Sequence, residues 1–528
     1  MLTPQMLGLP AKFQTWRDGQ ARLVEEIVNS DAYAYLLDAP TGTGKSIIGI
    51  GAHLLSREPC VYITSTKQLQ NQLYSDFPSV VRLKGRSNYA CLLHPKEFPD
   101  YTTEDCTHTK EKPCPKFFKC VYNRKKARAI LASLVVLNTS YFLREANGPG
   151  MFSGRKLLVI DELDLMEREL MGFIELSVTE RELSYLGIPP PVDPTSRDGW
   201  MEWMFRLDVS GYINKISRQL PLVEDNWNTR DCKASKKQKH YERFQHKVSR
   251  LLLEIDDNWL FTYNEEGTRR SAARATMSRL TGDYWTISFK PILVGPFAQQ
   301  YLWRHAEKVL GMSGTILKPE VLTGELALED WTYEQLQSPF PVEHRPIYYT
   351  PVVNLTQKTI QVELPKLVAH VDRLINQYPN DKILVHTTSY KIRDYLLENL
   401  KSSRLITHES HDRVAKLKEF MESKKPLAML SPSFDRGIDL HQELCRCIII
   451  CKVPYLNLGD DQIKARMKVP GGMLWYYVRA AQTIVQMSGR AVRSMDDYCD
   501  TFILDRQFSA LRGKVGHIFP KWWREAIR

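Results

Sequence analysis

The sequence lacks any run of apolar residues that approaches the length needed to cross a bilayer. Its first twenty residues, MLTPQMLGLPAKFQTWRDGQ, lack a basic stretch followed by an apolar core, so no secretory signal is visible. We therefore expect a cytoplasmic protein without a membrane partner. Thiols stay reduced in the cytoplasm, which argues against disulfides for the ten cysteines.

Acidic residues are the minority charge. Lys and Arg number 72 against 61 Asp and Glu, which gives a net charge of +11 and a pI near 9.0. This excess favours a polyanionic partner, although extra lysine also serves solubility alone. A hydrophobic content of 43% and a charged content of 25% are ordinary for a soluble globular protein. The length of 528 residues predicts roughly three to four folding units.

Short apolar runs followed by helical patterns recur along the chain, which is typical of parallel α/β units. The proline-rich segment SPFPVEHRP (338–346) divides these units into two groups, so we predict two α/β sheets in sequence. The predicted strands are 32–38, 60–64, 133–138, 156–161 and 309–313, followed by 382–387, 427–431, 447–454 and 501–505.

Two stretches break this rhythm and are interpreted as insertions into the first α/β domain. One, around residues 84–128, holds clustered cysteines and many basic residues, and the other, around 166–290, has a mainly helical pattern. The predicted organisation is a first α/β domain at 1–83, 131–165 and 291–337, a cysteine insertion at 84–130, a helical insertion at 166–290, and a second α/β domain at 338–528.

The strongest single motif is DAPTGTGKS, residues 38–46, between an apolar strand and a helical pattern. A glycine-rich turn in this position lets backbone N–H groups surround phosphate oxygens, and the helix N-terminus adds a favourable dipole. Lys45 is expected to reach the β- and γ-phosphates of ATP, and the Ser46 hydroxyl to bind Mg²⁺. The rest of the predicted phosphate loop is Ala39, Pro40, Thr41, Gly42, Thr43 and Gly44.

A second motif, KLLVIDELD at 156–164, is an apolar strand that ends in carboxylates. Asp161 is expected to hold Mg²⁺, and Glu162 to orient and deprotonate the attacking water. Acidic strand ends are common, so it is the pairing with the phosphate loop that predicts ATP hydrolysis.

A third motif, QMSGRAVRS at 486–494, ends an amphipathic helical stretch in the second half. Arg490 and Arg493 are predicted to lie on one helix face, since they are three residues apart. Guanidinium groups delivered from a second domain can act as arginine fingers on the γ-phosphate. A solvated basic helix face is the equally weighted alternative.

Four cysteines lie between the two ATP motifs, at Cys91, Cys106, Cys114 and Cys120. Four thiolates ligate either a [4Fe–4S] cluster or a tetrahedral Zn²⁺. No CxxC pair of the kind typical of zinc sites occurs here and the spacing is irregular, so a cluster is favoured over zinc and over unliganded thiols. His94 and His108 are alternative ligands.

Basic residues surround these cysteines, with Phe117 and Phe118 between them. Such a surface suits single-stranded DNA, because phosphates meet cations and bases stack on rings. For the two adjacent rings, packing around the metal core is the favoured interpretation. The cations also balance the charge of a thiolate-ligated cluster. They are Lys110, Lys112, Lys116, Lys119, Arg124, Lys125, Lys126 and Arg128.

In this order the motifs resemble those of the XPD-like and DinG-like iron–sulfur DNA helicases of superfamily 2, from about residue 13 to residue 506. The resemblance implies two RecA-like motor domains with ATP between them, a [4Fe–4S] insertion, and an arch that encloses single-stranded DNA. It also implies nucleotide contacts from Arg17 and Gln20 in RDGQ, from Gly437 and Asp439 in SPSFDRGIDL, and a catalytic role for Gln486 beside the two arginines. Further matching segments are ITSTKQLQNQL (63–73), GRSNYAC (85–91), GMSGTI (311–316), SPF (338–340) and HTTSY (386–390).

The resemblance further implies an ATP-dependent DNA helicase that moves 5′→3′, opens forked duplexes and works as a monomer. Such an enzyme is expected at the nucleoid in a prokaryote or virus and in the nucleus of a eukaryote. Asp164 stands where the family's DEAH box has histidine, and Arg436 stands where glutamate usually precedes the glycine. These departures leave the two carboxylates intact and question how well hydrolysis is coupled to DNA. The alternatives are a DNA-stimulated ATPase that displaces proteins without unwinding, and a metal- or redox-sensing nucleic-acid-binding protein.

Overall fold

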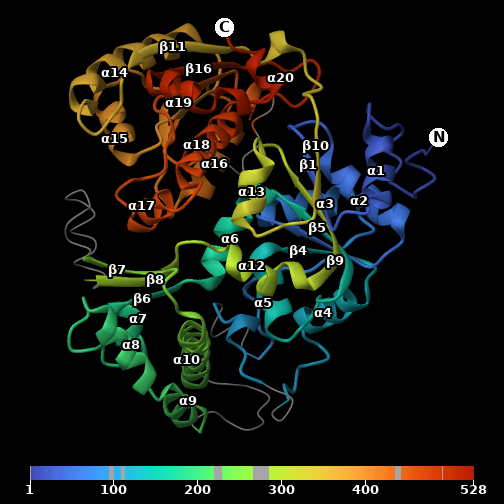
Figure 1. Ribbon diagram of the computed structural model, residues 1–528, viewed down its shortest axis with the longest axis vertical. Coiled ribbons are helices and arrows are strands. Elements are labelled where there is room, and N and C mark those ends of the chain that lie inside the picture. The colour runs from blue at the N-terminus through green and yellow to red at the C-terminus, as the bar shows by residue number, and fades with distance from the viewer. Residues whose placement is uncertain are drawn as a thin grey trace.

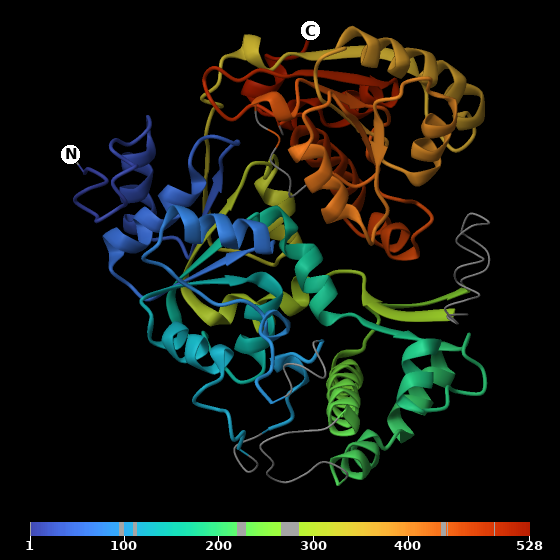
Figure 2. The same ribbon diagram turned by 180° about the vertical axis from the view of Figure 1, so that it is seen from behind.

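The computed structural model describes residues 2–93, 100–108, 113–218, 229–265, 285–434, 440, 442–489 and 491–528. Two parallel sheets flanked by helices lie one above the other, and a further part rich in helices extends below the first sheet (Figure 1). Seen from behind, the N-terminal helices cover the first sheet (Figure 2). No helix within the described ranges is long and apolar enough to cross a membrane.

The first sheet has seven parallel strands in the order β10-β1-β9-β5-β2-β4-β3. Along β1, Leu36 faces one hydrophobic core and Leu37 faces another, because a parallel strand covered on both sides alternates between two buried faces. The strands are β1 (Ala34–Asp38), β2 (Cys60–Thr64), β3 (Val81–Arg82), β4 (Leu134–Asn138), β5 (Arg155–Asp161), β9 (Ala306–Ser313) and β10 (Trp331–Gln335). The accompanying helices are α1 (Gln20–Asn29), α2 (Lys45–Ser56), α3 (Lys67–Asp76), α4 (Val121–Leu131), α5 (Thr139–Asn147), α6 (Met166–Ile174), α12 (Gly295–Tyr301) and α13 (Pro319–Glu325).

The second sheet has six parallel strands in the order β11-β16-β15-β12-β14-β13. The strands are β11 (Ile347–Val353), β12 (Ile383–His386), β13 (Leu405–Thr407), β14 (Ala428–Ser431), β15 (Cys447–Ile450) and β16 (Asp500–Asp505). The helices are α14 (Ile360–Gln377), α15 (Tyr390–Asn399), α16 (Arg413–Glu422), α17 (Asp461–Lys468), α18 (Gly472–Ser488), α19 (Gln507–Val515) and α20 (Lys521–Arg524). All nine predicted strands are present in the two sheets, with ends that differ by a few residues.

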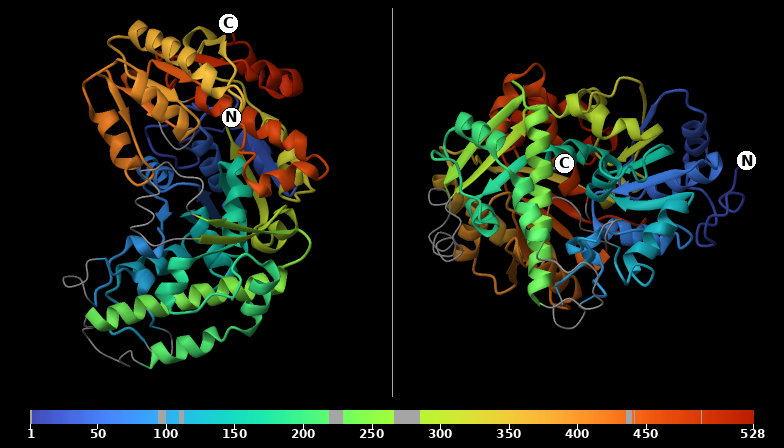
Figure 3. Two further views of the ribbon diagram at one scale, coloured as in Figure 1. Left: turned by 90° about the vertical axis from the view of Figure 1, so that its left-hand side faces the viewer. Right: turned by 90° about the horizontal axis from the view of Figure 1, so that it is seen from below.

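The part below the first sheet is mainly helical, and it also contains a three-stranded antiparallel sheet in the order β6-β8-β7, which the sequence did not predict. Its strands are β6 (Leu176–Thr179), β7 (Trp259–Glu265) and β8 (Trp285–Pro291), and its helices are α7 (Glu180–Leu186), α8 (Arg197–Arg206), α9 (Val209–Ser217) and α10 (Thr229–Glu254). The 26-residue helix α10 runs through this part as one long rod (Figure 3).

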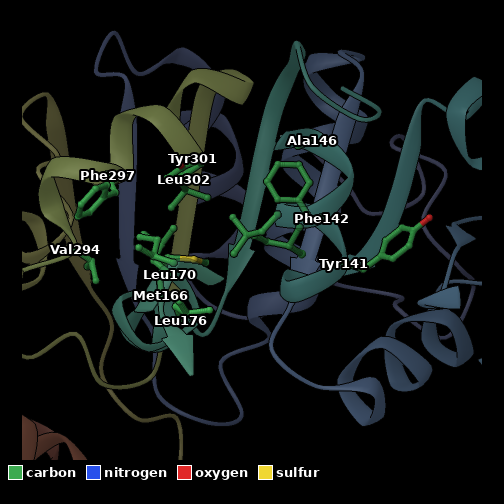
Figure 4. Packing of buried hydrophobic residues seen from close by; sticks show 14 of the residues in the cluster. Tyr141, Phe142, Ala146, Met166, Leu170, Leu176, Val294, Phe297, Tyr301 and Leu302 are labelled. Carbon is green, nitrogen blue, oxygen red and sulfur yellow. The ribbon is translucent and has the colours of Figure 1, made fainter. Parts of the chain in front are cut away.

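One hydrophobic core joins this lower part to the first sheet. Trp200 of α8 and Phe244 of α10 belong to the same buried cluster as Leu158 of β5. Near the sheet, Phe142 of α5 and Leu170 of α6 pack in this cluster with residues of α12 (Figure 4). The lower part is therefore anchored by continuous apolar packing rather than by a flexible linker.

Candidate active site

The phosphate loop lies between β1 and α2, as the motif predicts. Gly42 and Gly44 have φ angles of 86° and 83°, in the left-handed region that glycine adopts without steric cost. The Lys45 ammonium donates to the carbonyl oxygen of Ala39 at 3.0 Å, so its side chain folds back over the loop. Pro40, Thr41 and Thr43 complete the loop, and Ser46 lies in the first turn of α2.

This loop is held by Arg17, which lies before α1, and by Gln20, the first residue of α1. Gln20 is buried, and its Nε2 donates to the carbonyl oxygen of Thr43 at 2.7 Å. Its Oε1 accepts from the backbone N–H of Arg17 at 2.8 Å, and the Arg17 guanidinium donates to the carbonyl oxygen of Gly42. The segment RDGQ therefore lies directly against the phosphate loop.

A side chain from beyond the first sheet also meets the loop. A methyl group built at Gly42 would lie 2.2 Å from Cζ of Phe340, so only glycine fits beneath this ring. Phe340 is buried in a core cluster of the second domain. The SPF segment thus connects the phosphate loop to the second domain, a contact that no spacing rule in the sequence predicts.

Two carboxylates lie at the end of β5, Asp161 as its last residue and Glu162 directly after it. Asp161 is buried, and its Oδ1 has no hydrogen-bond partner in the described part of the chain. Burial and the neighbouring charge of Glu162 raise the pKa of Asp161 to about 7, while Lys45 opposes this rise. Glu162 has a φ of 59°, a strained backbone angle for a residue other than glycine. A buried carboxylate oxygen without a partner, facing a lysine, fits a site for a cation.

Asp164 connects the acidic motif to the segment GMSGTI. Its Oδ1 accepts a hydrogen bond from Ser313 Oγ at 2.6 Å, and its Oδ2 accepts one from Thr315 Oγ1 at 3.2 Å. Gln486 Nε2 of α18 donates to the same Oδ2 at 3.1 Å and to Thr315 Oγ1 at 2.5 Å. The aspartate that replaces the family's histidine therefore makes a physical link between both domains.

The prediction that Arg490 and Arg493 share a helix face is wrong. Helix α18 ends at Ser488, where the N–H of Gly489 bonds to the carbonyl oxygen of Val485, and Arg493 lies in the irregular segment that follows. A glycine at this point favours the end of a helix. Arg490 itself lies outside the described residues, as do Arg436, Gly437 and Asp439.

The structure brings the four predicted cysteines into one region. A hydrogen bond from the Cys114 thiol lowers the pKa of Cys106 to about 4, and Cys106 Sγ lies 3.4 Å from His108 Nδ1. Cys91 is buried, and burial raises its pKa to about 12, with smaller contributions from nearby Cys106 and Cys120. His94 lies outside the described residues, and among those described no three His, Cys, Asp or Glu side chains form a site for one metal ion.

A fifth cysteine, Cys232 of α10, joins this region. It is fully buried in a small cluster with Cys91, Leu93 and Tyr101, and Cys114 packs against this cluster. Tyr101 OH donates to Ser235 Oγ of α10 at 2.7 Å, which fixes the helix to the cysteine segment. Cys91 and Cys232 are 141 positions apart in the sequence, so no local pattern predicts this contact.

Phe117 and Phe118 do not pack around the cysteines, which corrects the favoured interpretation. They are 50% and 88% exposed, and their rings contact each other edge to face with centroids 5.4 Å apart. The two rings are therefore free to contact a partner from solvent instead of supporting the cysteines.

The comparisons with known proteins agree with this geometry. Residues 17–179 match the DEAD/DEAH box helicase family, and residues 371–526 match the helicase C-terminal domain. ATP-dependent DNA helicase YoaA of Escherichia coli is 22% identical over 90% of this chain and 89% of its own length. ATP-dependent DNA helicase DinG of Photobacterium profundum is 25% identical over 43% of this chain and 35% of its own. The chain is an XPD/DinG-like superfamily 2 helicase.

Solved structures show the same fold. An XPD helicase structure aligns with 96% of this helicase and 97% of its own chain, at a TM-score of 0.61 and 16% identity. The structure of S. tokodaii Xpd4 aligns with 97% and 99%, at a TM-score of 0.57 and 17% identity. The two parallel sheets are therefore tandem RecA-like domains, called motor domains below, and this helicase is an ATP-hydrolysing enzyme.

Proposed function

We propose that this helicase hydrolyses ATP between its motor domains to move along single-stranded DNA, 5′→3′, and to unwind forked duplexes. The observation that carries the proposal is Gln486 of the second domain, which hydrogen-bonds both Asp164 and Thr315 of the first. A link of this kind lets the separation or closure of the domains follow the state of the nucleotide. Curated relatives over most of the chain are named ATP-dependent DNA helicases, which supports DNA as the partner.

We propose a role for each residue of the ATP site. Lys45 binds the β- and γ-phosphates above the loop, and Ser46 with Asp161 holds Mg²⁺. The partnerless oxygen of buried Asp161 supports the last assignment. Glu162, next along the chain, orients and deprotonates the attacking water. Gln486, Arg490 and Arg493 act from the second domain on the γ-phosphate, with Gly437 and Asp439 near the nucleotide, and Arg17 and Gln20 at the adenine.

The cysteine segment is proposed to hold a [4Fe–4S] cluster through Cys91, Cys106, Cys114 and Cys120, with zinc as the alternative. The four thiols lie in one region, with Cys91 buried and the other three partly buried, which supports the assignment because clustered thiolates are the ligands of both groups. When bound, the cluster supplies a rigid four-point cross-link of an otherwise irregular segment. The chain's own residues then present the exposed rings of Phe117 and Phe118 to DNA.

The DNA path is proposed to pass between the cysteine segment and the part formed by residues 166–290, which would act as an arch. Exposed Phe118 beside Lys116 and Lys119 supports stacking of bases together with contacts to phosphates. The cations of α10 support DNA binding less, since Lys236 donates to the carbonyl oxygen of Asp100 at 3.0 Å and others are similarly paired. We propose that the protein works as a monomer at the fork.

The test compares the full-length protein with Lys45→Ala and with Lys464→Ala, an exposed lysine of α17, as the control. Forked duplexes with only a 5′ or only a 3′ loading strand are supplied, and ATP hydrolysis is measured with and without single-stranded DNA. ATP-dependent unwinding from the 5′ strand that Lys45→Ala abolishes supports the proposal. DNA-stimulated hydrolysis without unwinding supports a translocase instead. Unwinding by Lys45→Ala would contradict the proposal that ATP bound at the phosphate loop drives unwinding.

The metal is tested separately on protein purified without oxygen. A broad absorption band near about 400 nm with bound iron supports the cluster. Colourless protein with stoichiometric zinc would replace that assignment by a zinc site without affecting the motor.

A further inference from the structure

Buried charged side chains join the two motor domains beside the acidic motif. Arg479 of α18 and Arg466 of α17 come from the second domain, and Glu167 of α6 and Glu325 of α13 come from the first. We call these four residues the cross-domain cluster. Their side chains are between 3% and 13% exposed, so water screens their charges little.

Arg479 is the centre of this cluster. Its Nη2 lies 2.6 Å from Glu167 Oε2 and 2.8 Å from Glu325 Oε2, so both of its carboxylate partners belong to the other domain. Glu167 also accepts a hydrogen bond from Trp475 Nε1 at 3.2 Å and lies 3.7 Å from Arg466 Nη2. The planar guanidinium suits several acceptors at once, which a lysine ammonium would hold less rigidly.

The same arginine reaches the acidic motif. Arg479 Nη1 donates to the backbone carbonyl oxygen of Asp164 at 2.8 Å, while Gln486 donates to the carboxylate of that residue. Between them, Gln482 Nε2 donates to the carbonyl oxygen of Ile316 at 3.3 Å. Positions 479, 482 and 486 lie on one face of α18, so one helix face holds Asp164 at its backbone and at its side chain.

The turn that contains Asp164, residues 163–165, directly follows the proposed reacting groups Asp161 and Glu162. Glu162 has a left-handed φ of 59°, a conformation that persists only where the surroundings impose it. The Asp164 carbonyl lies two residues further along the chain. A bond from the second domain at this carbonyl therefore restrains the backbone that positions both Asp161 and Glu162.

The cluster is poorly built as a simple stabilising contact. Glu167 Oε1, Glu325 Oε1 and Arg466 Nε are buried without a hydrogen-bond partner in the described part of the chain. Buried ion pairs with unsatisfied atoms contribute little net stability, because desolvation offsets their attraction. We therefore infer that the cross-domain cluster serves to fix the position of the acidic motif more than to stabilise the fold.

We propose that Arg479 is a positioning residue for ATP hydrolysis: through the Asp164 carbonyl it sets the acidic motif in its reactive geometry only while the second domain is seated on Glu167 and Glu325. The inference rests on the proposed motor function. According to this inference, the chemical step requires the second domain for two reasons: it supplies the arginines of QMSGRAVRS, and it positions the acidic motif through Arg479. A residue that acts this way affects turnover more than nucleotide binding.

The test compares wild type, Arg479→Gln and Arg479→Lys in the full-length protein. Arg512→Gln, at an exposed arginine of α19 in the same domain, is the matched control. Measurements are kcat and KM for ATP with saturating single-stranded DNA, binding of a fluorescent non-hydrolysable ATP analogue, and Tm. We expect Arg479→Gln to lower kcat about a hundredfold with KM and analogue binding within about threefold of wild type, as small misplacements of reacting groups do. Arg512→Gln should match wild type.

Arg479→Lys keeps the charge and guards against a folding defect in Arg479→Gln. If the glutamine variant does not fold, a lysine variant with normal Tm and KM and at least about tenfold lower kcat supports the proposal, since only the fork geometry is lost. Wild-type kcat in either folded variant overturns it, and so does a loss of activity that merely follows the loss of folded protein. Absence of ATP hydrolysis in the wild type would instead defeat the proposed function itself.

Discussion

Two contacts in this helicase join segments that are far apart in sequence, and they are built in opposite ways. Between the motor domains, α18 meets the acidic motif through buried charges, and the Glu325 side chain is only 3% exposed. Between α10 and the cysteine segment, the charged pair Arg243 and Glu104 is 43% and 28% exposed at a separation of 3.7 Å. Water screens the second pair and not the first.

The groups at the centre of the two contacts also differ in charge. The α10 contact is fixed by neutral groups, since Tyr101 OH donates to Ser235 Oγ and Ser235 Oγ donates to the carbonyl oxygen of Asp105 at 2.6 Å. The α18 contact is instead fixed by buried ionisable groups, Arg479 with Glu167 and Glu325. We therefore expect the motor contact to be sensitive to geometry and charge, and the α10 contact to tolerate loss of its charges.

The largest effect is expected at Asp164, where both domains meet. Asp164→Ala removes the acceptor of Ser313, Thr315 and Gln486, and we expect DNA-stimulated kcat to fall about a hundredfold, because reacting groups are displaced. Steady-state ATPase assays check this against Asp461→Ala, an exposed aspartate of α17. Equal activity of the two variants would show that the link is dispensable.

A pH-dependent effect is expected at Glu325. Burial raises its pKa from 4.5 to about 8, although Arg479 and Arg466 oppose the rise and Glu167 and Asp164 add to it. Between these values the folded state binds more protons than the unfolded state, so stability falls as pH rises. Relative to Glu325→Gln, the wild-type free energy of unfolding should fall by about 1.4 kcal/mol per pH unit from pH 5 to 8.

Denaturant unfolding of both proteins at several pH values measures this slope. Parallel curves for wild type and Glu325→Gln would mean that Glu325 stays ionised in the folded state. The charged contact would then be as robust to pH as the neutral α10 contact.

A smaller effect is expected on the exposed surface of the cysteine segment. Phe118→Ala should weaken single-stranded DNA binding about tenfold, because stacking of a base on an aromatic ring contributes about 1–3 kcal/mol. Leu131→Ala is the matched control, since Leu131 of α4 is 87% exposed but cannot stack. Fluorescence anisotropy with labelled oligonucleotide gives both affinities, and equal losses would point to general apolar contact instead of stacking.

The smallest effect is expected where α10 carries exposed charge. Arg243→Gln should change the free energy of unfolding by less than about 1 kcal/mol, as is usual for screened surface pairs. Ser235→Ala, which removes a buried hydroxyl from the same contact, should cost more, about 1–2 kcal/mol. The reverse order in denaturant unfolding would contradict the division between the two contacts.

Much of the fold was predictable because its signals are local. The nine predicted strands lie in parallel sheets covered on both faces, so they read as continuous apolar runs. The missed strands lie mainly at sheet edges. β10 is only partly buried along its length, and β11 contains Pro351, which is tolerated at an edge but weakens a strand pattern.

The candidate site was also predictable only where its signals are local. The phosphate loop and the acidic strand end could be predicted because each needs only a strand, a turn and a helix in order. The contact from Gln486 to Asp164 spans 322 residues, and the helix that carries Gln486 ends before the arginines predicted to share it. Periodicity gave no signal for Arg479, because a charged residue in an amphipathic helix is usually solvated.

Local sequence patterns were enough to predict nine strands, the phosphate loop, the acidic motif, the cysteine spacing and the helicase family, because these features depend on neighbours along the chain. The folded structure was needed to show that Asp164, where the family has a histidine, still links the two domains, and that Arg479 meets two carboxylates of the other domain. It also decided that Cys232 joins the cysteine segment and that Phe118 faces water. These contacts depend on how helices and sheets stack, which distant parts of the chain settle together.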